Sequence, residues 1–227
     1  MLFNSYEFIF AFLPATIVGY FGLTHRRMIL ASRLWLTGAS LLFYGYWDVR
    51  YVPLLLISIF VNFFVGSSFD AKVKTNRQAS LLFGICFNIV LLSYFKYADF
   101  FLTNYNGLFN SHLPLLHVAL PLGISFFTFT QIAYLVDAYK GKAKEYDLLR
   151  YALFVTYFPH LLAGPILHHS EMMPQFGSRW NWAIRWRNVA TGLVLFSVGL
   201  FKKTVIADTF AQWANAGFDT ASTLRKH

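Results

Sequence analysis

Charged residues are scarce in this chain. Only 13% of its 227 residues are Asp, Glu, Lys or Arg, whereas 57% are hydrophobic and 20% are aromatic. A soluble domain carries roughly 25% charged residues, so this chain lacks the polar surface that water would require. The low charge and the 26 Phe and 13 Tyr residues predict an all-α, polytopic helical membrane protein. We expect residues 1–227 to form a single membrane domain.

Cysteine and the common cofactor-binding motifs are also nearly or wholly missing. Cys86 is the single cysteine, which excludes a disulfide framework within the chain, and we interpret it as a buried, inert thiol. The spacings His-x-x-x-His, Cys-x-x-Cys and Glu-x-x-His do not occur, so we predict no metal site. A P-loop, a dinucleotide fingerprint and a Gly-x-Ser-x-Gly elbow are absent as well, so we predict no bound cofactor.

Basic residues exceed acidic ones, giving a net charge of +9. They are scattered among apolar segments instead of forming one patch, which argues against nucleic-acid binding. The loops at 26–33, 70–77 and 140–150 are positive, and the loops between them are neutral. By the positive-inside rule the positive loops face the cytoplasm and the amino terminus faces outward. Membrane lipid is therefore the expected surrounding.

Long apolar segments dominate the chain, and each of the first four approaches the ~20 residues that a helix needs to cross hydrocarbon. They are Tyr6–Leu23, Leu34–Trp47, Val52–Phe69 and Ala79–Phe95. The Asn-containing stretch Phe100–His117 is interpreted as an outer-face loop with an interfacial helix. With Leu120–Gly141, Tyr151–His169 and Asn188–Phe210, about six to seven membrane-embedded helices are expected.

The segment Leu120–Gly141 opens with Pro121 and Gly123, which discourage a helix start further upstream, and ends at Gly141, which indicates a helix stop. Between them it carries a polar thread. Ser125, Thr128 and Gln131 fall within about 120° on a helix, and such a face requires protein or a water-filled cavity beside it. Gln131 could line a cavity or make an interhelical hydrogen bond.

Asp137, further along the same segment, has two readings. It could line a reaction cavity, or it could sit at the helix end and pair with Lys140 at i+3. We favour the helix-end role, because a charged side chain costs little free energy near the membrane interface and much more at the bilayer centre.

The segment Tyr151–His169 contains Pro159, Gly164 and Pro165. We interpret it as a broken or re-entrant segment, which would place Ser170–Asn188 at the cytoplasmic face and so satisfy the positive-inside rule.

The histidines of this region are interpreted as packing or solvated residues. His160 is either a proton carrier or a packing residue, and packing is favoured. His168 and His169 point about 100° apart on a helix and are expected to be solvated at the interface.

The residues that follow combine three tryptophans with three arginines. The tryptophans are Trp180, Trp182 and Trp186, and this pattern predicts an interfacial amphipathic helix.

Three segments resemble one family. The segments are MLFNSYEFIFAFLP (Met1–Pro14), LPLGISFFTFTQIAYLVDAYKG (Leu120–Gly141) and YFPHLLAGPILHHSEMMPQF (Tyr157–Phe176). They resemble signature segments of the membrane-bound O-acyltransferase family, in its branch of bacterial alginate O-acetylation proteins. The resemblance extends over the whole chain and implies a multi-pass protein of the bacterial inner membrane.

The resemblance implies transfer of an acyl group from a cytoplasmic thioester such as acetyl-CoA to periplasmic acetyltransferase partners that modify an exopolysaccharide. It places the family's catalytic histidine downstream of the matched segments, so no catalytic residue is assigned and the 227 residues alone are expected to be inactive. The candidates for lining a substrate tunnel are Ser125, Thr128, Gln131, Asp137 and His160. The alternatives are a transporter or channel-like subunit, a structural subunit, and D-alanyl transfer to teichoic acid within the same family.

Overall fold

The structure is a computed structural model that describes residues 1–70, 76–143, 147–161, 168–178 and 181–224, and within these ranges every regular element is a helix. The elements are η1 (Glu7–Phe12), α1 (Leu13–His25), α2 (Ile29–Gly45), η2 (Val49–Tyr51), α3 (Val52–Ser67), α4 (Arg77–Phe109), α5 (Ile124–Tyr139), α6 (Leu148–Thr156), α7 (Phe158–Leu161), α8 (His169–Gly177), α9 (Trp186–Phe201), η4 (Lys202–Ala207) and α10 (Asp208–Leu224). The predicted all-α class is confirmed.

Four of the described helices are long and apolar enough to cross a membrane. They are Glu7–His25, Val49–Ser67, Arg77–Phe109 and Trp186–Phe218. Helices α2 and α5 are shorter, with 17 and 16 residues. The four spans make the chain a multi-pass membrane protein, while the expected total of six to seven embedded helices stays a prediction.

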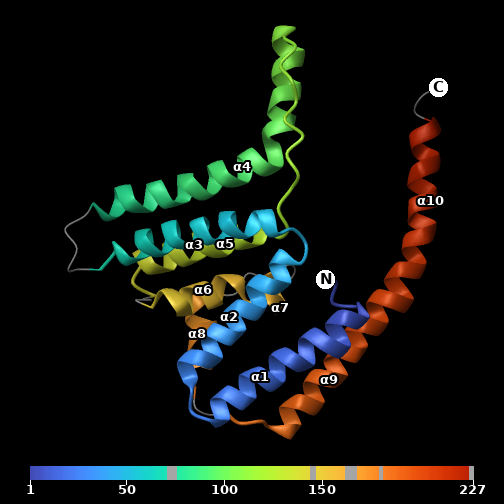
Figure 1. The fold of residues 1–227 in the computed structure, drawn as a ribbon. Helices are drawn as coiled ribbons and strands as arrows, with labels where there is room; N and C mark the ends of the chain where they lie inside the picture. The colour runs from blue at the N-terminus through green and yellow to red at the C-terminus, as the bar shows by residue number, and fades with distance from the viewer. Residues whose placement is uncertain (71–75, 144–146, 162–167, 179–180, 225–227) are drawn as a thin grey trace.

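The main core lies where α3, α5 and α6 meet, with α4 covering α3 and α5 (Figure 1). Leu55, Tyr134, Leu135, Tyr151 and Phe154 are each at most 1% exposed there. Tyr151 and Phe154 of α6 are fully buried in this core. They anchor the segment that precedes the break in the chain.

A second, aromatic core joins the amino terminus to the middle of the chain. The ring of Phe8 lies 5.8 Å from Phe43 of α2 and 6.0 Å from Phe158 of α7, and Phe12 lies 5.2 Å from Phe158. Such edge-to-face pairs contribute about 0.5–1.5 kcal/mol beyond burial. The segments Met1–Pro14 and Tyr157–Phe176 therefore meet in space.

The boundaries of α5 follow the expected backbone signals. Gly123 precedes the helix with φ 65° and Gly141 follows it with φ 74°. Both values lie in the left-handed region that glycine adopts without steric cost. The expected helix start and stop in Leu120–Gly141 are confirmed.

Helix α4 is longer than the sequence indicated. The expected outer-face loop at Phe100–His117 is wrong for its first part, because α4 continues to Phe109 and leads away from the bundle (Figure 1). The side-chain amide of Asn104 donates to the carbonyl of Phe100 at 2.7 Å. An asparagine satisfied by its own helix does not break it, so asparagine content was a poor stop signal here.

The chain returns from α4 along the same helix. The carboxylate of Asp99 accepts hydrogen bonds from the backbone N–H groups of Leu116 and His117, at 2.8 and 3.0 Å. Helix α4 ends at Asn110, whose φ is 47°. A single acidic side chain thus ties the returning segment to the second half of α4.

Two further expectations were wrong. Residues 181–185 are not α-helical and α9 begins at Trp186, so the predicted interfacial helix does not include Trp182, and Trp180 lies outside the described residues. Cys86 is exposed on α4, not buried. An apolar run in a membrane helix need not face protein, because lipid accepts apolar side chains equally well.

Candidate functional site

A chain of buried hydrogen bonds crosses the core of the bundle. The Gln131 side-chain amide of α5 donates to the Ser58 hydroxyl of α3 at 2.9 Å, and the Tyr151 hydroxyl of α6 donates to the Gln131 carbonyl oxygen at 3.4 Å. All three residues are fully buried. Of the two readings of Gln131, interhelical hydrogen bonding is confirmed by these contacts.

An asparagine pair extends the same polar layer to α4. The Asn88 amide donates to the Asn62 side-chain oxygen at 2.6 Å, and the Asn62 amide donates back at 3.4 Å. Each amide also donates to a carbonyl of its own helix, at Gly84 and Ser58 respectively. Both side chains are fully buried, so four helices are joined by polar contacts inside an apolar core.

The hydroxyl groups of Thr128 and Ser125, the other two members of the polar thread, also make hydrogen bonds within the protein. The Thr128 hydroxyl donates to the Ile124 carbonyl of its own helix at 2.7 Å. The Lys96 ammonium of α4 donates to the Ser125 hydroxyl at 3.4 Å. The shared face of Ser125, Thr128 and Gln131 therefore packs against protein, as a polar face in a membrane requires.

Asp137 lies in the last turn of α5, so its expected helix-end position is confirmed. Its partner is a different residue from the one expected: Asp137 Oδ2 lies 2.8 Å from His168 Nδ1, at the start of α8, and the predicted pairing with Lys140 is not the contact found. The pair is an ion pair only when His168 is protonated. Since Asp137 is 14% and His168 52% exposed, this contact holds α8 to α5 at an accessible edge.

His160 lies in the predicted break, and the break itself is confirmed. Helix α6 ends at Thr156, Tyr157 leaves helical geometry with ψ 106°, and α7 follows with four residues. Gly164 and Pro165, which were also expected to contribute to the break, lie outside the described residues. The ring of His160 lies 5.8 Å from that of Tyr157, so the packing role is favoured.

The described residues form a large pocket that the sequence did not indicate. It has a volume of about 1140 Å³ and is walled by the amino-terminal segment, α1, α7, α8 and α9. We call it the α1–α9 pocket. Among the described residues, none of the five tunnel candidates lines it, and their role in a substrate tunnel stays a prediction.

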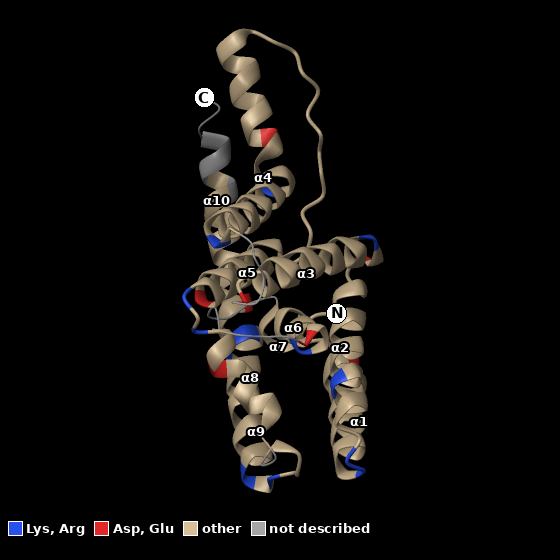
Figure 2. Cartoon of the chain, turned by 90° about the vertical axis from the view of Figure 1, so that its left-hand side faces the viewer, with Lys and Arg blue, Asp and Glu red and all other residues tan. Residues whose placement is uncertain are grey.

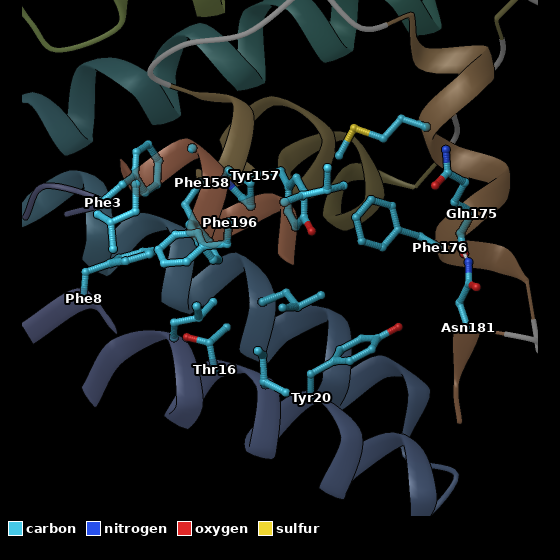
Figure 3. A pocket seen from close by; sticks show the side chains of 18 of the residues that line it. Phe3, Phe8, Thr16, Tyr20, Tyr157, Phe158, Gln175, Phe176, Asn181 and Phe196 are labelled. Carbon is cyan, nitrogen blue, oxygen red and sulfur yellow. Dashed lines mark hydrogen bonds between the residues drawn. The ribbon is translucent and has the colours of Figure 1, made fainter. Parts of the chain in front are cut away.

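The α1–α9 pocket has two different ends (Figure 3). Phe3, Phe8, Phe158 and Phe196 lie at one end, and Tyr20, Gln175 and Asn181 lie at the other together with Phe176. The Asn181 amide donates to the Gln175 carbonyl at 2.8 Å, which fixes the polar end. The signal that could have revealed the pocket was present: Met1–Pro14 and Tyr157–Phe176 both line it.

The chemistry available in the described residues is that of a scaffold. No group of three His, Cys, Asp or Glu side chains able to hold a metal occurs in the part of the chain that the structure describes. The polar layer fixes helices, and the α1–α9 pocket offers an apolar volume with a hydrogen-bonding end. This arrangement can hold an amphipathic molecule.

Comparisons with known proteins agree with the motifs. Residues 73–226 match the profile of MBOAT, the membrane-bound O-acyltransferase family. The chain is 47% identical to the peptidoglycan O-acetyltransferase of Helicobacter pylori, over 99% of this chain and 48% of that protein. It is 34% and 36% identical to the probable alginate O-acetylases AlgI of Pseudomonas aeruginosa and Pseudomonas putida, over 96% of this chain and 42% and 45% of theirs. No solved structure matches.

Proposed function

Because the chain belongs to the membrane-bound O-acyltransferase family, we propose that it is the membrane scaffold of an O-acetyltransferase that modifies a polysaccharide outside the cytoplasm. The observation that carries this proposal is its likeness to named O-acetyltransferases over nearly its whole length. The chain spans about half the length of the curated relatives it matches. Activity, donor and acceptor are therefore proposals.

The acceptor is proposed to be a sugar hydroxyl. The names of the relatives give two such acceptors, peptidoglycan and alginate, and the higher identity is to the peptidoglycan enzyme, 47% against 34% and 36%. The donor is proposed to be a cytoplasmic thioester such as acetyl-CoA, with periplasmic acetyltransferases as partners. Moving an acetyl group between the two compartments requires a route lined by protein, because hydrocarbon excludes polar intermediates.

The 227 residues are proposed to give structural support to the route along which the acetyl group crosses the membrane. A layer of buried hydrogen bonds running through α3, α4, α5 and α6 restricts how these helices can shift. General-base chemistry on the acceptor hydroxyl would come from the catalytic histidine that the family resemblance places outside these 227 residues.

A complementation experiment tests the proposal. The chain is expressed in bacteria that lack their own O-acetyltransferase, alone and together with the remaining half of the Helicobacter pylori relative. We expect labelled acetate to become ester-linked to peptidoglycan when both halves are present, and neither half alone to produce the ester. Mass spectrometry of the purified glycan measures the product, and an alginate-producing host tests the second acceptor.

Two results would contradict this proposal. Ester formation by the 227 residues alone would show that the scaffold role is wrong. Labelled acetate that only crosses vesicles, with no covalent product on any glycan, would favour the transporter alternative.

We further propose an inner-membrane location with the amino terminus outside. The positive loops at 26–33, 70–77 and 140–150 support this orientation, as does the break after α6, which allows the arginines near α9 to remain in the cytoplasm.

Cysteine labelling checks this orientation. In a Cys86→Ser background, needed because Cys86 is exposed, we expect a Ser178→Cys variant to react with a membrane-impermeant maleimide only after the cells are opened. A cysteine placed at Asn4 is the matched outer control. Labelling of position 178 in intact cells would reject the proposed topology.

A further inference from the structure

We propose that the α1–α9 pocket binds one acyl chain of an anionic phospholipid, whose headgroup lies against arginines at the polar end of the pocket. The site is separate from the acetyl-transfer role proposed above. Four features support it: the length of the pocket, its two chemically different ends, the charge beside the polar end, and its position at the edge of the bundle.

The length of the pocket matches a lipid tail. On α1 its wall runs from Leu13 to Phe21, and on α9 and the start of η4 it runs from Leu195 to Lys203; at about 1.5 Å per residue each wall rises about 12 Å. One leaflet has about half of the ~30 Å hydrocarbon thickness. The volume of about 1140 Å³ slightly exceeds the range of about 300–1,000 Å³ for drug-sized ligands, and a two-carbon acetyl group would leave it almost empty.

The two ends suit the two parts of a lipid. Phe3, Phe8, Phe158 and Phe196 close the apolar end (Figure 3), where a tail terminates among aromatic rings. The opposite end carries hydrogen-bonding side chains, including the tyrosine hydroxyl of Tyr20. An amphipathic ligand is oriented by this asymmetry, with its polar group toward the end of α1.

Positive charge gathers beside the polar end. Arg26 and Arg27 follow α1, and Arg185 and Arg187 flank the start of α9; all four are exposed, and they colour the same end of the molecule (Figure 2). The charged residues that line the pocket itself are Glu171 and Lys203, Lys203 is paired with Asp208, and the four arginines add positive charge beside the pocket. Basic residues at a membrane surface attract anionic lipid, which selects an anionic headgroup over a zwitterionic one.

One contact holds these two basic segments together. The hydroxyl of Thr24, in the last turn of α1, donates to the Trp182 carbonyl at 3.0 Å. Thr24 is buried, and this hydrogen bond connects positions 158 residues apart. This hydrogen bond therefore joins the end of α1 to the segment before α9, and each of these two segments carries arginines.

Within these 227 residues, helix α9 leaves one side of the pocket uncovered. None of its described residues is buried, and only Phe196 packs against the aromatic core. A tail can therefore enter sideways between α1 and α9 without any helix having to unfold.

The test uses native mass spectrometry of the 227-residue protein in detergent, supplied with phosphatidylglycerol or phosphatidylcholine carrying the same oleoyl chains. Gly199 lines the pocket, and open space surrounds the position of a Cβ there. We expect the wild type to retain one phosphatidylglycerol and Gly199→Trp to retain none, because the indole occupies the volume of the tail. Gly217→Trp, at an equally open position on α10 outside the pocket, is expected to bind as the wild type does.

A second pair of variants tests the headgroup without filling the pocket. Removing a basic residue near the membrane surface is expected to weaken binding of an anionic lipid about fivefold. We expect the double variant Arg185→Gln, Arg187→Gln to bind phosphatidylglycerol about 25-fold more weakly. Arg50→Gln is the control, because Arg50 lies in η2 before α3, and it is expected to have no effect.

The outcomes decide the proposal. Equal retention by Gly199→Trp and wild type would remove the pocket as the site. Equal binding of phosphatidylcholine and phosphatidylglycerol, or no effect of the two arginine substitutions, would overturn the anionic headgroup. Acetyl transfer does not enter these measurements, so their result is independent of the proposed function.

Discussion

Replacement of Gly84 by leucine is expected to give the largest loss of stability in the bundle. An ideal Cβ at Gly84 would lie 2.5 Å from Leu135 Cδ1 and 3.0 Å from Val65 Cγ1. Small residues at such positions let membrane helices approach closely. Leu135 is fully buried, so either its side chain must move within a packed core or α4 must shift away from α5. Overpacking of this kind costs typically about 1–3 kcal/mol and occasionally more, and we expect the upper end.

The measurement is the free energy of unfolding by SDS titration in mixed micelles, followed by circular dichroism. Gly107→Leu is the matched control, since it is the same substitution on the same helix and nothing lies within 4 Å of its Cβ. Leucine there is expected to stabilise by up to about 1 kcal/mol through its helix propensity. Equal stability of the two variants would mean that α4 and α5 are not in the close contact described.

Loss of one member of the Asn62–Asn88 pair is the second large effect. Asn88→Leu leaves the Asn62 side chain with one buried partner fewer, and an unmet buried polar group costs about 1–3 kcal/mol. Each amide keeps a bond to its own helix, so we expect about 1–2 kcal/mol for either single substitution. The double replacement by leucine is expected to recover part of the loss.

A double-mutant cycle in the same SDS titration separates the pairwise contribution. Interhelical hydrogen bonds in membrane proteins contribute about 0.6 kcal/mol on average and up to about 1.7, and the coupling should fall within that range. Asn104→Leu is the control on α4, because its amide bonds only a carbonyl of its own exposed turn; we expect a change within about 0.5 kcal/mol. Zero coupling between Asn62 and Asn88 would contradict the role given to the polar layer.

Most of the helical structure could be read from the sequence. Gly123 and Gly141 marked the ends of α5, and Pro159 marked the break after α6, because proline and glycine act on the backbone locally. The extension of α4 to Phe109 was missed, since Asn104 bonds to a carbonyl of its own helix and does not form a turn. The exposure of Cys86 was missed for a different reason, namely that lipid and protein interior are both apolar.

The site was less predictable than the helices. The sequence singled out Gln131 and Asp137, and it gave two readings for each. It could not identify Ser58 and Tyr151 as the partners of Gln131, or His168 as the partner of Asp137, because those residues are distant along the chain. The α1–α9 pocket was missed although both segments that line it had been noted, since their encounter depends on the packing of Phe8 against Phe158.

By itself, the sequence determined that this chain is a helical membrane protein, where α5 begins and ends, and where the chain breaks after α6. These properties depend on composition and on the backbone preferences of neighbouring residues. Only the tertiary structure decided which face of each helix meets protein, which polar groups pair across helices, and that a long apolar pocket lies beside α9. In water, amphipathic patterning distinguishes inside from outside; in a bilayer both sides of a helix are apolar, so that information exists only in the packing.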